Sequence, residues 1–400
     1  TGWVADAYYE QPSQRLRVLA VTGTNGKTST VEMTRQIWRM MGHRAASIGT
    51  LGITTADESV STGLTTPDIV TFLANMSGLA REGVTHVAYE ASSHGLAQYR
   101  NEGLQVAAGA FTNLSRDHLD YHQTMENYFA AKMRLFDEVV GDGAAAVIWA
   151  DDEWSDRAIE HARQRDLRLY TVGERGQAIR LVSRTPGQLG QMLELVYAGQ
   201  PYRVNLPLIG GYQAANALVA AGLVVATGGD AAQVFDALGR LQPVRGRLER
   251  AAITKLGAPV YVDYAHTPDA LEAAFAALRP HCTGRLICVF GAGGDRDEGK
   301  RPEMGRIAAA QADLAIVTDD NPRSEDPAAI RASIMAGGNG KLREVADRRA
   351  AIAAAIAAAQ GDDIVLIAGK GHEQGQIIGA GESLRVLPFD DVTVARECAA

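Results

Sequence analysis

The segment Thr-Gly-Thr-Asn-Gly-Lys-Thr-Ser at residues 22–29 follows a run of aliphatic residues and precedes a helical stretch. Gly23 and Gly26 let the backbone turn its N–H groups toward phosphate oxygens, and the start of a helix adds positive potential there. Lys27 can neutralise the outer phosphates of a nucleotide, and Thr28 can ligate magnesium. Only two residues separate the glycines, fewer than in the general motif, so an ordinary glycine-rich turn is the alternative. The order strand, loop, helix predicts a phosphate-binding loop in an α/β domain.

Short runs of β-branched and other aliphatic residues alternate with helical stretches along the whole chain. This alternation predicts buried parallel strands in two series, at 16–21, 86–90, 108–112 and 144–149, then at 260–264, 285–290, 314–317 and 364–367. Shorter alternating segments between 167 and 208 predict a small antiparallel sheet attached to the first domain, and helices are expected at 213–227 and 348–360. A chain of 400 residues that is 46% apolar can bury more than one core. We therefore expect two α/β domains, at 1–246 and 247–400.

The composition excludes several classes of protein. A net charge of -8 and a pI near 5.6 argue against a surface for nucleic acid. The three cysteines, Cys282, Cys288 and Cys398, form neither an even disulfide set nor a CxxC pair. No run approaches the ~18 apolar residues of a membrane span, and residues 1–15 are too polar for a signal peptide. We expect a soluble, cytoplasmic protein with no nucleic-acid or membrane partner.

Polar residues gather where two of the predicted strands end. Glu90 closes one strand and is followed by Ala-Ser-Ser-His-Gly, and the segment Phe-Thr-Asn-Leu-Ser-Arg-Asp-His-Leu-Asp at 111–120 leaves another. The carboxyl ends of parallel strands lie at one edge of a sheet, where ligands of α/β proteins bind. We expect both segments at that edge. Taken separately, either is equally a solvated loop, with His118 capping a helix.

The short loop Gly-Thr-Asn-Gly-Lys-Thr, together with the Glu90 and His118 segments, resembles motifs of the Mur ligase family, which also contains the folylpolyglutamate synthases. The resemblance implies a P-loop-type central ATPase domain with a mostly parallel sheet, followed by a Rossmann-like C-terminal α/β domain. It also implies Mg²⁺ bound by Thr28, Glu90 and His118. The ATP-binding residues that it implies in the loop are Gly23, Thr24, Asn25, Gly26, Lys27, Thr28 and Ser29.

Lys132 stands in a predicted helix that begins after Thr124, and a lysine there is by itself a surface residue. In the ligases that this chain resembles, the matching lysine is carbamylated. That modification converts an ammonium into an oxygen anion, which suits a second magnesium ion. With Lys27, Glu90 and His118, Lys132 completes the catalytic set that the resemblance implies.

Other residues resemble the family's substrate contacts. Those implied for the muramoyl peptide are Thr65, Thr66, Ser93 and Arg100. The first two also make a generic helix start with the proline that follows.

Three further residues resemble the family's nucleotide contacts. They are Asn216 in Gly-Gly-Tyr-Gln-Ala-Ala-Asn-Ala, Arg247 in Pro-Val-Arg-Gly-Arg and His266 in Asp-Tyr-Ala-His-Thr-Pro. An arginine on a hinge can hold ATP only when the domains close. The alternative for Asn216 is an asparagine packed within a helix.

The segment Asp-Asn-Pro-Arg at 320–323 resembles the amino-acid selector of the ligases in this family that add diaminopimelate. Diaminopimelate ends in a carboxylate and an ammonium where lysine has only an ammonium, so its pocket needs both signs of charge. The guanidinium of Arg323 can clamp that carboxylate through two parallel hydrogen bonds. The alternative is an Asn-Pro turn with Arg323 in solvent. The other implied contacts are Arg296, Asp320, Asn321, Gly369 and Glu373.

The resemblance implies an ATP-dependent ligase of peptidoglycan synthesis with three substrates: ATP, UDP-N-acetylmuramoyl-L-alanyl-D-glutamate and meso-diaminopimelate. The carboxylate would attack the γ-phosphate of ATP, and the amine would then displace phosphate from the acyl phosphate. The alternatives are a folylpolyglutamate synthase-like ligase, a lysine-adding ligase and a truncated module that binds ATP without catalysis.

Ligases of this kind carry an additional N-terminal domain for the uridine nucleotide, whereas the loop here begins already at Thr22. We expect intact ATP and diaminopimelate sites, weak affinity for the nucleotide-linked substrate, and a monomer.

Overall fold

The computed structural model of the chain describes residues 2–60 and 63–400. It contains two compact units. The first unit consists of Thr1–Thr185, Met192–Pro207 and Gly211–Gln242, and the second of Pro186–Gln191, Leu208–Gly210 and Pro243–Ala400. Within the part of the chain that the structure describes, no helix has the length and apolar character to cross a membrane.

The first unit is built on an 11-stranded sheet in the order β11-β10-β9-β8-β7-β6-β1-β5-β2-β3-β4. β1 lies in the middle and pairs in parallel with both β5 and β6. Its strands are β1 Arg17–Thr22, β2 Ala45–Gly49, β3 Gly52–Thr54, β4 Ser59–Val60, β5 His86–Glu90, β6 Val106–Phe111, β7 Val140–Trp149, β8 Arg168–Gly173, β9 Ile179–Gly187, β10 Gly190–Tyr197 and β11 Gln200–Leu206.

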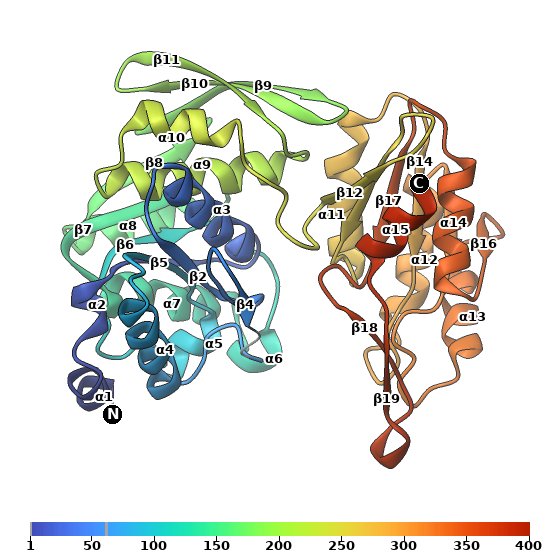
Figure 1. Cartoon of the computed structure of the whole chain (residues 1–400), viewed down its shortest axis with the longest axis horizontal. Coiled ribbons are helices and arrows are strands. Elements are labelled where there is room, and N and C mark those ends of the chain that lie inside the picture. The colour runs from blue at the N-terminus through green and yellow to red at the C-terminus, as the bar shows by residue number, and fades with distance from the viewer. Residues whose placement is uncertain (1, 61–62) are drawn as a thin grey trace. The chain divides into compact units, whose positions relative to one another are not determined.

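Helices cover both faces of this sheet, which is why its central strands are buried and aliphatic. In Figure 1, α3, α9 and α10 lie on one face, and α4, α5 and α7 lie on the other. The helices of the first unit are α1 Gly2–Tyr8, α2 Pro12–Arg15, α3 Lys27–Met40, α4 Ile69–Arg81, α5 Ser93–Ala97, α6 Leu119–His122, α7 Met125–Arg134, α8 Ser155–Gln164, α9 Gly211–Ala226 and α10 Ala231–Leu238. The predicted cap of α7 is confirmed, since the side chain of Thr124 accepts a hydrogen bond from the N–H of Asn127.

The shorter strands predicted after residue 167 are present, but they do not form a sheet of their own. β8 pairs in parallel with β7, and β9 to β11 extend the same sheet at its outer end. β9, β10 and β11 follow one another through two-residue connections, at 188–189 and 198–199. A strand pattern identifies such segments, but it does not say which sheet edge they join.

The second unit contains a six-stranded sheet in the order β12-β13-β17-β14-β15-β16, in which only β12 is antiparallel to its neighbour. A separate hairpin, β18 with β19, follows β17. The strands are β12 Glu249–Ile253, β13 Pro259–Asp263, β14 Leu286–Phe290, β15 Leu314–Val317, β16 Leu342–Glu344, β17 Ile364–Ala368, β18 Gly375–Ile378 and β19 Arg385–Pro388, and the helices are α11 Pro268–Leu278, α12 Lys300–Gln311, α13 Pro327–Gly337, α14 Arg348–Ala358 and α15 Asp391–Ala399.

The central strand β14 shows how this sheet is buried on both sides. Leu286, Cys288 and Phe290 pack against α11, α12 and α13, whereas Ile287 and Val289 pack against α14 and α15. Successive strand side chains point to opposite faces, so a strand covered on both sides reads as a continuous aliphatic run. This explains why the predicted strands of both series are found within a few residues of their expected positions.

Candidate active site

The phosphate loop connects the end of β1 to the first turn of α3. Gly23 and Gly26 have φ angles of 143° and 85°, which side chains with a Cβ rarely adopt. A Cβ on Gly26 would collide with Asn216 of α9, so the asparagine predicted to reach the nucleotide lies directly against the loop. The hydroxyl of Thr112 donates to the carbonyl of Asn25 at 2.7 Å. The loop is therefore held by the end of β6 on one side and by α9 on the other.

Two lysines converge on one carbonyl of this loop. The Nζ atoms of Lys27 and Lys132 lie 2.9 and 2.7 Å from the carbonyl oxygen of Gly23. Lys132 is 1% exposed, and burial, together with the neighbouring Lys27, holds its pKa well below the ordinary value for lysine. It is therefore no surface residue. The amine of Lys132 therefore loses its proton more readily than an exposed lysine, and it lies beside the predicted phosphate site.

Glu90 and Thr28, two predicted magnesium ligands, are brought together. The hydroxyl of Thr28 donates to Oε1 of Glu90 at 2.9 Å, and the N–H of Thr50 donates to the same oxygen at 2.7 Å. Glu90 is 2% exposed at the end of β5. The carboxylate is therefore fixed in orientation, with its hydrogen-bond donors at the mouth of the phosphate loop.

Three of the residues predicted to contact the peptide, Thr65, Thr66 and Arg100, are linked through hydrogen-bond contacts to the end of β5 or to Thr50. The Thr66 hydroxyl donates to the carbonyl of Glu90 at 2.8 Å, and Arg100 donates to the carbonyl of Thr66 at 2.7 Å. Thr65 lies within 3.2 Å of Thr50, oxygen to oxygen. Ser93 is buried, and its hydroxyl is 3.0 Å from Nε2 of His122.

His118 is the least enclosed of the predicted magnesium ligands. Its side chain is 46% exposed, and its ring lies 4.8 Å from that of His94 and 6.1 Å from that of Tyr128, centroid to centroid. It stands at the position before α6 with φ 52°, but its side chain makes no capping hydrogen bond, so helix capping does not account for it. Among residues 2–60 and 63–400, no three His, Cys, Asp or Glu side chains are gathered as a ready metal site.

In the second unit, Arg247 and His266 both lie close to the ring of Tyr264. The guanidinium of Arg247 is 5.1 Å from the centroid of the Tyr264 ring, and the His266 ring is 4.4 Å from it. His372 approaches the same ring at 4.9 Å, and burial lowers its pKa to about 4. The two predicted nucleotide contacts of this unit are thus neighbours.

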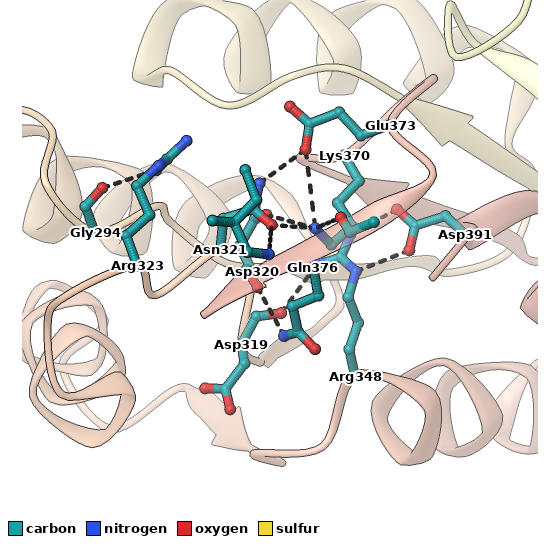
Figure 2. A network of polar contacts seen from close by, with 12 residues as sticks. Gly294, Asp319, Asp320, Asn321, Arg323, Arg348, Lys370, Glu373, Gln376 and Asp391 are labelled. Carbon is teal, nitrogen blue, oxygen red and sulfur yellow. Dashed lines mark hydrogen bonds and ion pairs between the residues drawn. The ribbon is translucent and has the colours of Figure 1, made fainter. Parts of the chain in front are cut away.

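The predicted amino-acid residues form a connected polar network, shown in Figure 2. Asn321 is 4% exposed, and its Nδ2 donates to Oε2 of Glu373 at 2.8 Å. Gly369 has φ 120°, and a Cβ there would lie 2.7 Å from a carboxylate oxygen of Asp320. Arg323, with φ 53°, donates to the carbonyl of Gly294 at 2.8 Å. Arg296 is not joined to this network, since its side chain is exposed and, within the part of the chain that the structure describes, bonds only to the carbonyl of Asp295.

Several residues of these networks were not predicted. Lys370 lies between Gly369 and Glu373 in sequence and is fully buried among Asp320, Asn321 and Glu373. A lysine directly after a buried strand was the available signal. Thr50 and Arg348 carry no comparable signal, because the first is an ordinary loop threonine and the second opens an alanine-rich helix.

A phosphate loop in one α/β unit, with a carboxylate and a hydroxyl beside it, defines a nucleotide-dependent enzyme of the P-loop type. The family model "Mur ligase middle domain" matches residues 21–224, and "Mur ligase, glutamate ligase domain" matches residues 246–371. The chain belongs to the Mur ligase family.

Individual members of the family are similar to this chain in sequence and in structure. UDP-N-acetylmuramoyl-L-alanyl-D-glutamate--2,6-diaminopimelate ligase of Zymomonas mobilis is 62% identical over 94% of this chain and 78% of the relative. A solved structure with the same name has a TM-score of 0.75 and 34% identity, covering 99% of this chain and 81% of that one. Mycobacterium tuberculosis folylpolyglutamate synthase, with a TM-score of 0.72 and 19% identity over 91% of each chain, shares the fold.

Proposed function

We propose that this chain catalyses the ATP-dependent addition of meso-diaminopimelate to UDP-N-acetylmuramoyl-L-alanyl-D-glutamate in peptidoglycan synthesis, releasing ADP and phosphate. The observation that carries the proposal is the chemistry of two separate sites. The first unit holds a phosphate loop with Thr28 hydrogen-bonded to Glu90. The second holds the guanidinium of Arg323, bonded to Gly294, and a network around Lys370 that contains the carboxylates of Asp320 and Glu373. An amide ligase that selects a zwitterionic side chain needs both.

In the first half-reaction, the substrate carboxylate attacks the γ-phosphate of ATP and forms an acyl phosphate. Phosphoryl transfer depends mainly on positioning and on neutralising charge. Backbone N–H groups at the start of α3 and the amine of Lys27 provide that at the loop. We propose that Asn216 contacts the nucleotide, and that the peptide is contacted by Arg100, Thr65, Thr66 and Ser93.

Thr28 and Glu90 fit a magnesium ion, because hydroxyl and carboxylate oxygens are the ligands that this hard cation prefers. When bound, magnesium neutralises phosphate charge. The N–H of Thr50 holds the Glu90 carboxylate in place for that role. His118, on an exposed loop, is the further ligand that we propose.

Lys132 fits the proposed carbamate. Carbon dioxide reacts with a neutral amine and not with an ammonium, and the lowered pKa of Lys132 favours the neutral form. The amine nitrogen bonds to the carbon of carbon dioxide and releases one proton to solvent. The product would be an oxygen anion close to Lys27, which is the neighbour that a new negative charge needs. The modification therefore replaces an unfavourable pair of amines with a favourable ion pair.

In the second half-reaction, the amine of diaminopimelate attacks the acyl phosphate. We propose that Arg323 binds the distal carboxylate of the amino acid. In residues 2–60 and 63–400, its side chain bonds only to the carbonyl of Gly294, which leaves most of its N–H groups for a ligand. Arg247 and His266 are proposed as nucleotide contacts, and a monomeric, cytoplasmic enzyme is the form that we propose for this reaction.

The test is phosphate release from ATP at saturating magnesium, with the muramoyl dipeptide nucleotide and one added amino acid. We expect release with meso-diaminopimelate, and background levels with lysine, with glutamate or without the nucleotide dipeptide. Release with lysine or glutamate instead would indicate a lysine-adding ligase or a folylpolyglutamate synthase-like ligase, respectively. No release with any amino acid, in a protein that still binds ATP, would identify a binding module and refute the proposal.

A further inference from the structure

Lys370 is a buried cation that none of the steps above uses. It is the second residue after β17 and is 0% exposed. Its Nζ donates to Oδ1 of Asn321 at 2.6 Å and to the carbonyl of Gly375 at 2.8 Å. It also forms an ion pair with Oδ1 of Asp320 at 3.3 Å. Burial lowers the pKa of this amine, and the adjacent Asp320 opposes that lowering.

The contacts of Lys370 join two segments that are far apart in the sequence, 319–323 and 369–377. Apart from Lys370, Asn321 Oδ1 also accepts from the N–H of Ile377 at 3.0 Å. The side chain of Gln376 donates to the carbonyl of Asp320 at 2.7 Å. Figure 2 shows Lys370 joined to Asp320 and Asn321 of the other segment. Residues 319–322 have no regular secondary structure, so side-chain bonds contribute to the conformation of that segment.

The network also distributes its charges unequally. Asp391 is completely buried and is taken by Arg348, with hydrogen bonds of 2.8 and 2.7 Å. Asp320, with a side chain 7% exposed, is paired with Lys370. Glu373 is 3.8 Å from Lys370, and its side chain is 31% exposed. Glu373 is therefore the one of these three carboxylates that a ligand can reach easily.

We propose that Lys370 is a positioning residue that sets amino-acid specificity by neutralising Asp320 and holding Asn321 and Glu373 in place. This inference rests on the proposed function. The network then presents one open carboxylate together with the guanidinium of Arg323, which matches a distal ammonium and carboxylate. Without Lys370, the carboxylates of Asp320 and Glu373 would lose their cation. The added negative charge would repel a carboxylate-bearing amino acid more than one that ends in an ammonium alone.

The experiment compares Lys370→Met, which keeps the length of the side chain and removes its charge, with Lys341→Met, the same change at an exposed lysine of the second unit. In Lys370→Met, the KM for diaminopimelate should rise at least about tenfold, or about 1.4 kcal/mol, while the KM for ATP stays within about twofold. The ratio of kcat/KM for diaminopimelate to that for lysine should fall at least as much. Lys341→Met should match the unmodified protein in all of these values.

A merely structural role would lower the amount of active protein and leave both KM values and the selectivity ratio unchanged, and that result would overturn the proposal. If Lys370→Met does not fold, Lys370→Gln, which keeps one donor, replaces it. Failure of both to fold would assign Lys370 to stability alone and would also overturn the proposal.

A second measurement requires no turnover. Hydrogen exchange at the N–H of Ile377, which is bonded to Asn321, should be faster in the Lys370 variant than in Lys341→Met. If the unmodified protein releases no phosphate with diaminopimelate, the proposed function fails. Unchanged exchange at Ile377 would instead refute the positioning role by itself.

Discussion

Lys132 in the first unit and Lys370 in the second are equally buried, at 1% and 0% exposed, but their surroundings are opposite. Lys370 has a carboxylate at 3.3 Å and an amide oxygen at 2.6 Å. Lys132 has one carbonyl oxygen, the face of the Tyr128 ring at 4.3 Å and another lysine nearby. Among residues 2–60 and 63–400, no carboxylate forms an ion pair with it.

The difference separates two uses of one side chain. A buried amine with anionic partners stays charged and organises its neighbours, because removing either partner leaves an uncompensated charge. A buried amine without them gives up its proton and becomes a nucleophile. Burial by itself therefore does not identify a catalytic lysine, whereas burial next to another cation does point to reactivity.

The largest expected effect is a loss of catalytic activity when Lys132 is replaced. Lys132→Met should reduce kcat by roughly 100-fold, the upper range for losing a group that supports a metal site. Lys255→Met, at an exposed lysine, is the matched control. Carbon-13 NMR with labelled bicarbonate should show a carbamate signal in the unmodified protein and in the control, but not in Lys132→Met. Full activity of Lys132→Met would remove the residue from the mechanism.

The two lysine substitutions should affect stability in the opposite order, with the larger loss of unfolding free energy in Lys370→Met. Because the folded-state pKa of Lys132 is lowered, the unfolded chain binds an additional proton below pH of about 10.4, and Lys132 lowers the unfolding free energy there. In buffer without carbon dioxide, Lys132→Met should therefore unfold at the same or a higher urea concentration at pH 7. Lys370→Met should lose about 3 to 5 kcal/mol, the cost of breaking a buried ion pair. Equal losses in the two variants would break the comparison.

The phosphate loop could be predicted from the sequence more fully than the network around Asn321. The phosphate loop was predictable because strand, glycines, lysine and helix follow one another within residues 17–40, and local chemistry decides their structure. The network around Asn321 was only partly predictable. Its motif pointed to the residues, but not to the fact that Asn321 has its side-chain oxygen taken by Lys370 and Ile377. Those contacts depend on which strand ends become neighbours in the folded sheet. The same holds for Arg348, because its position at the start of an alanine-rich helix does not reveal its partners.

The third prediction contrasts a buried cation with a more open one. The Nζ of Lys370 makes two hydrogen bonds and an ion pair, whereas the Arg323 side chain makes one hydrogen bond within residues 2–60 and 63–400. Arg323→Ala should cost diaminopimelate binding roughly 2 to 5 kcal/mol, so its KM rises at least about tenfold. Lysine does not carry the distal carboxylate, so its KM should change little. Arg323→Lys keeps the charge but loses the fork geometry of the guanidinium. Its KM for diaminopimelate should lie between that of the unmodified protein and that of Arg323→Ala. An unchanged KM for diaminopimelate in Arg323→Ala would place this side chain outside the site.

The smallest effect tests whether a buried base without an anionic partner must be functional. His86 at the start of β5 is 9% exposed beside Trp38 and His43, and burial together with His43 and Arg17 lowers its pKa from 6.5 to about 4. Between those values the unfolded chain binds a proton that the folded chain excludes, so the unfolding free energy falls as pH decreases from about 6.5 to about 4.

His86→Phe removes this group and keeps an aromatic ring against Trp38. The loss of unfolding free energy between pH 7 and pH 5 should therefore be about 1 to 2 kcal/mol smaller in the variant than in the unmodified protein. Urea unfolding at the two pH values measures it, and His161→Phe, at a histidine paired with Asp137, is the control. Since His86 lies at the N-terminal end of β5 and Glu90 at the other, kcat at pH 7 should be unaffected. A loss of activity in His86→Phe would mean that a buried base without an anionic partner is functional here too. The contrast between Lys132 and Lys370 would then depend on more than their immediate partners.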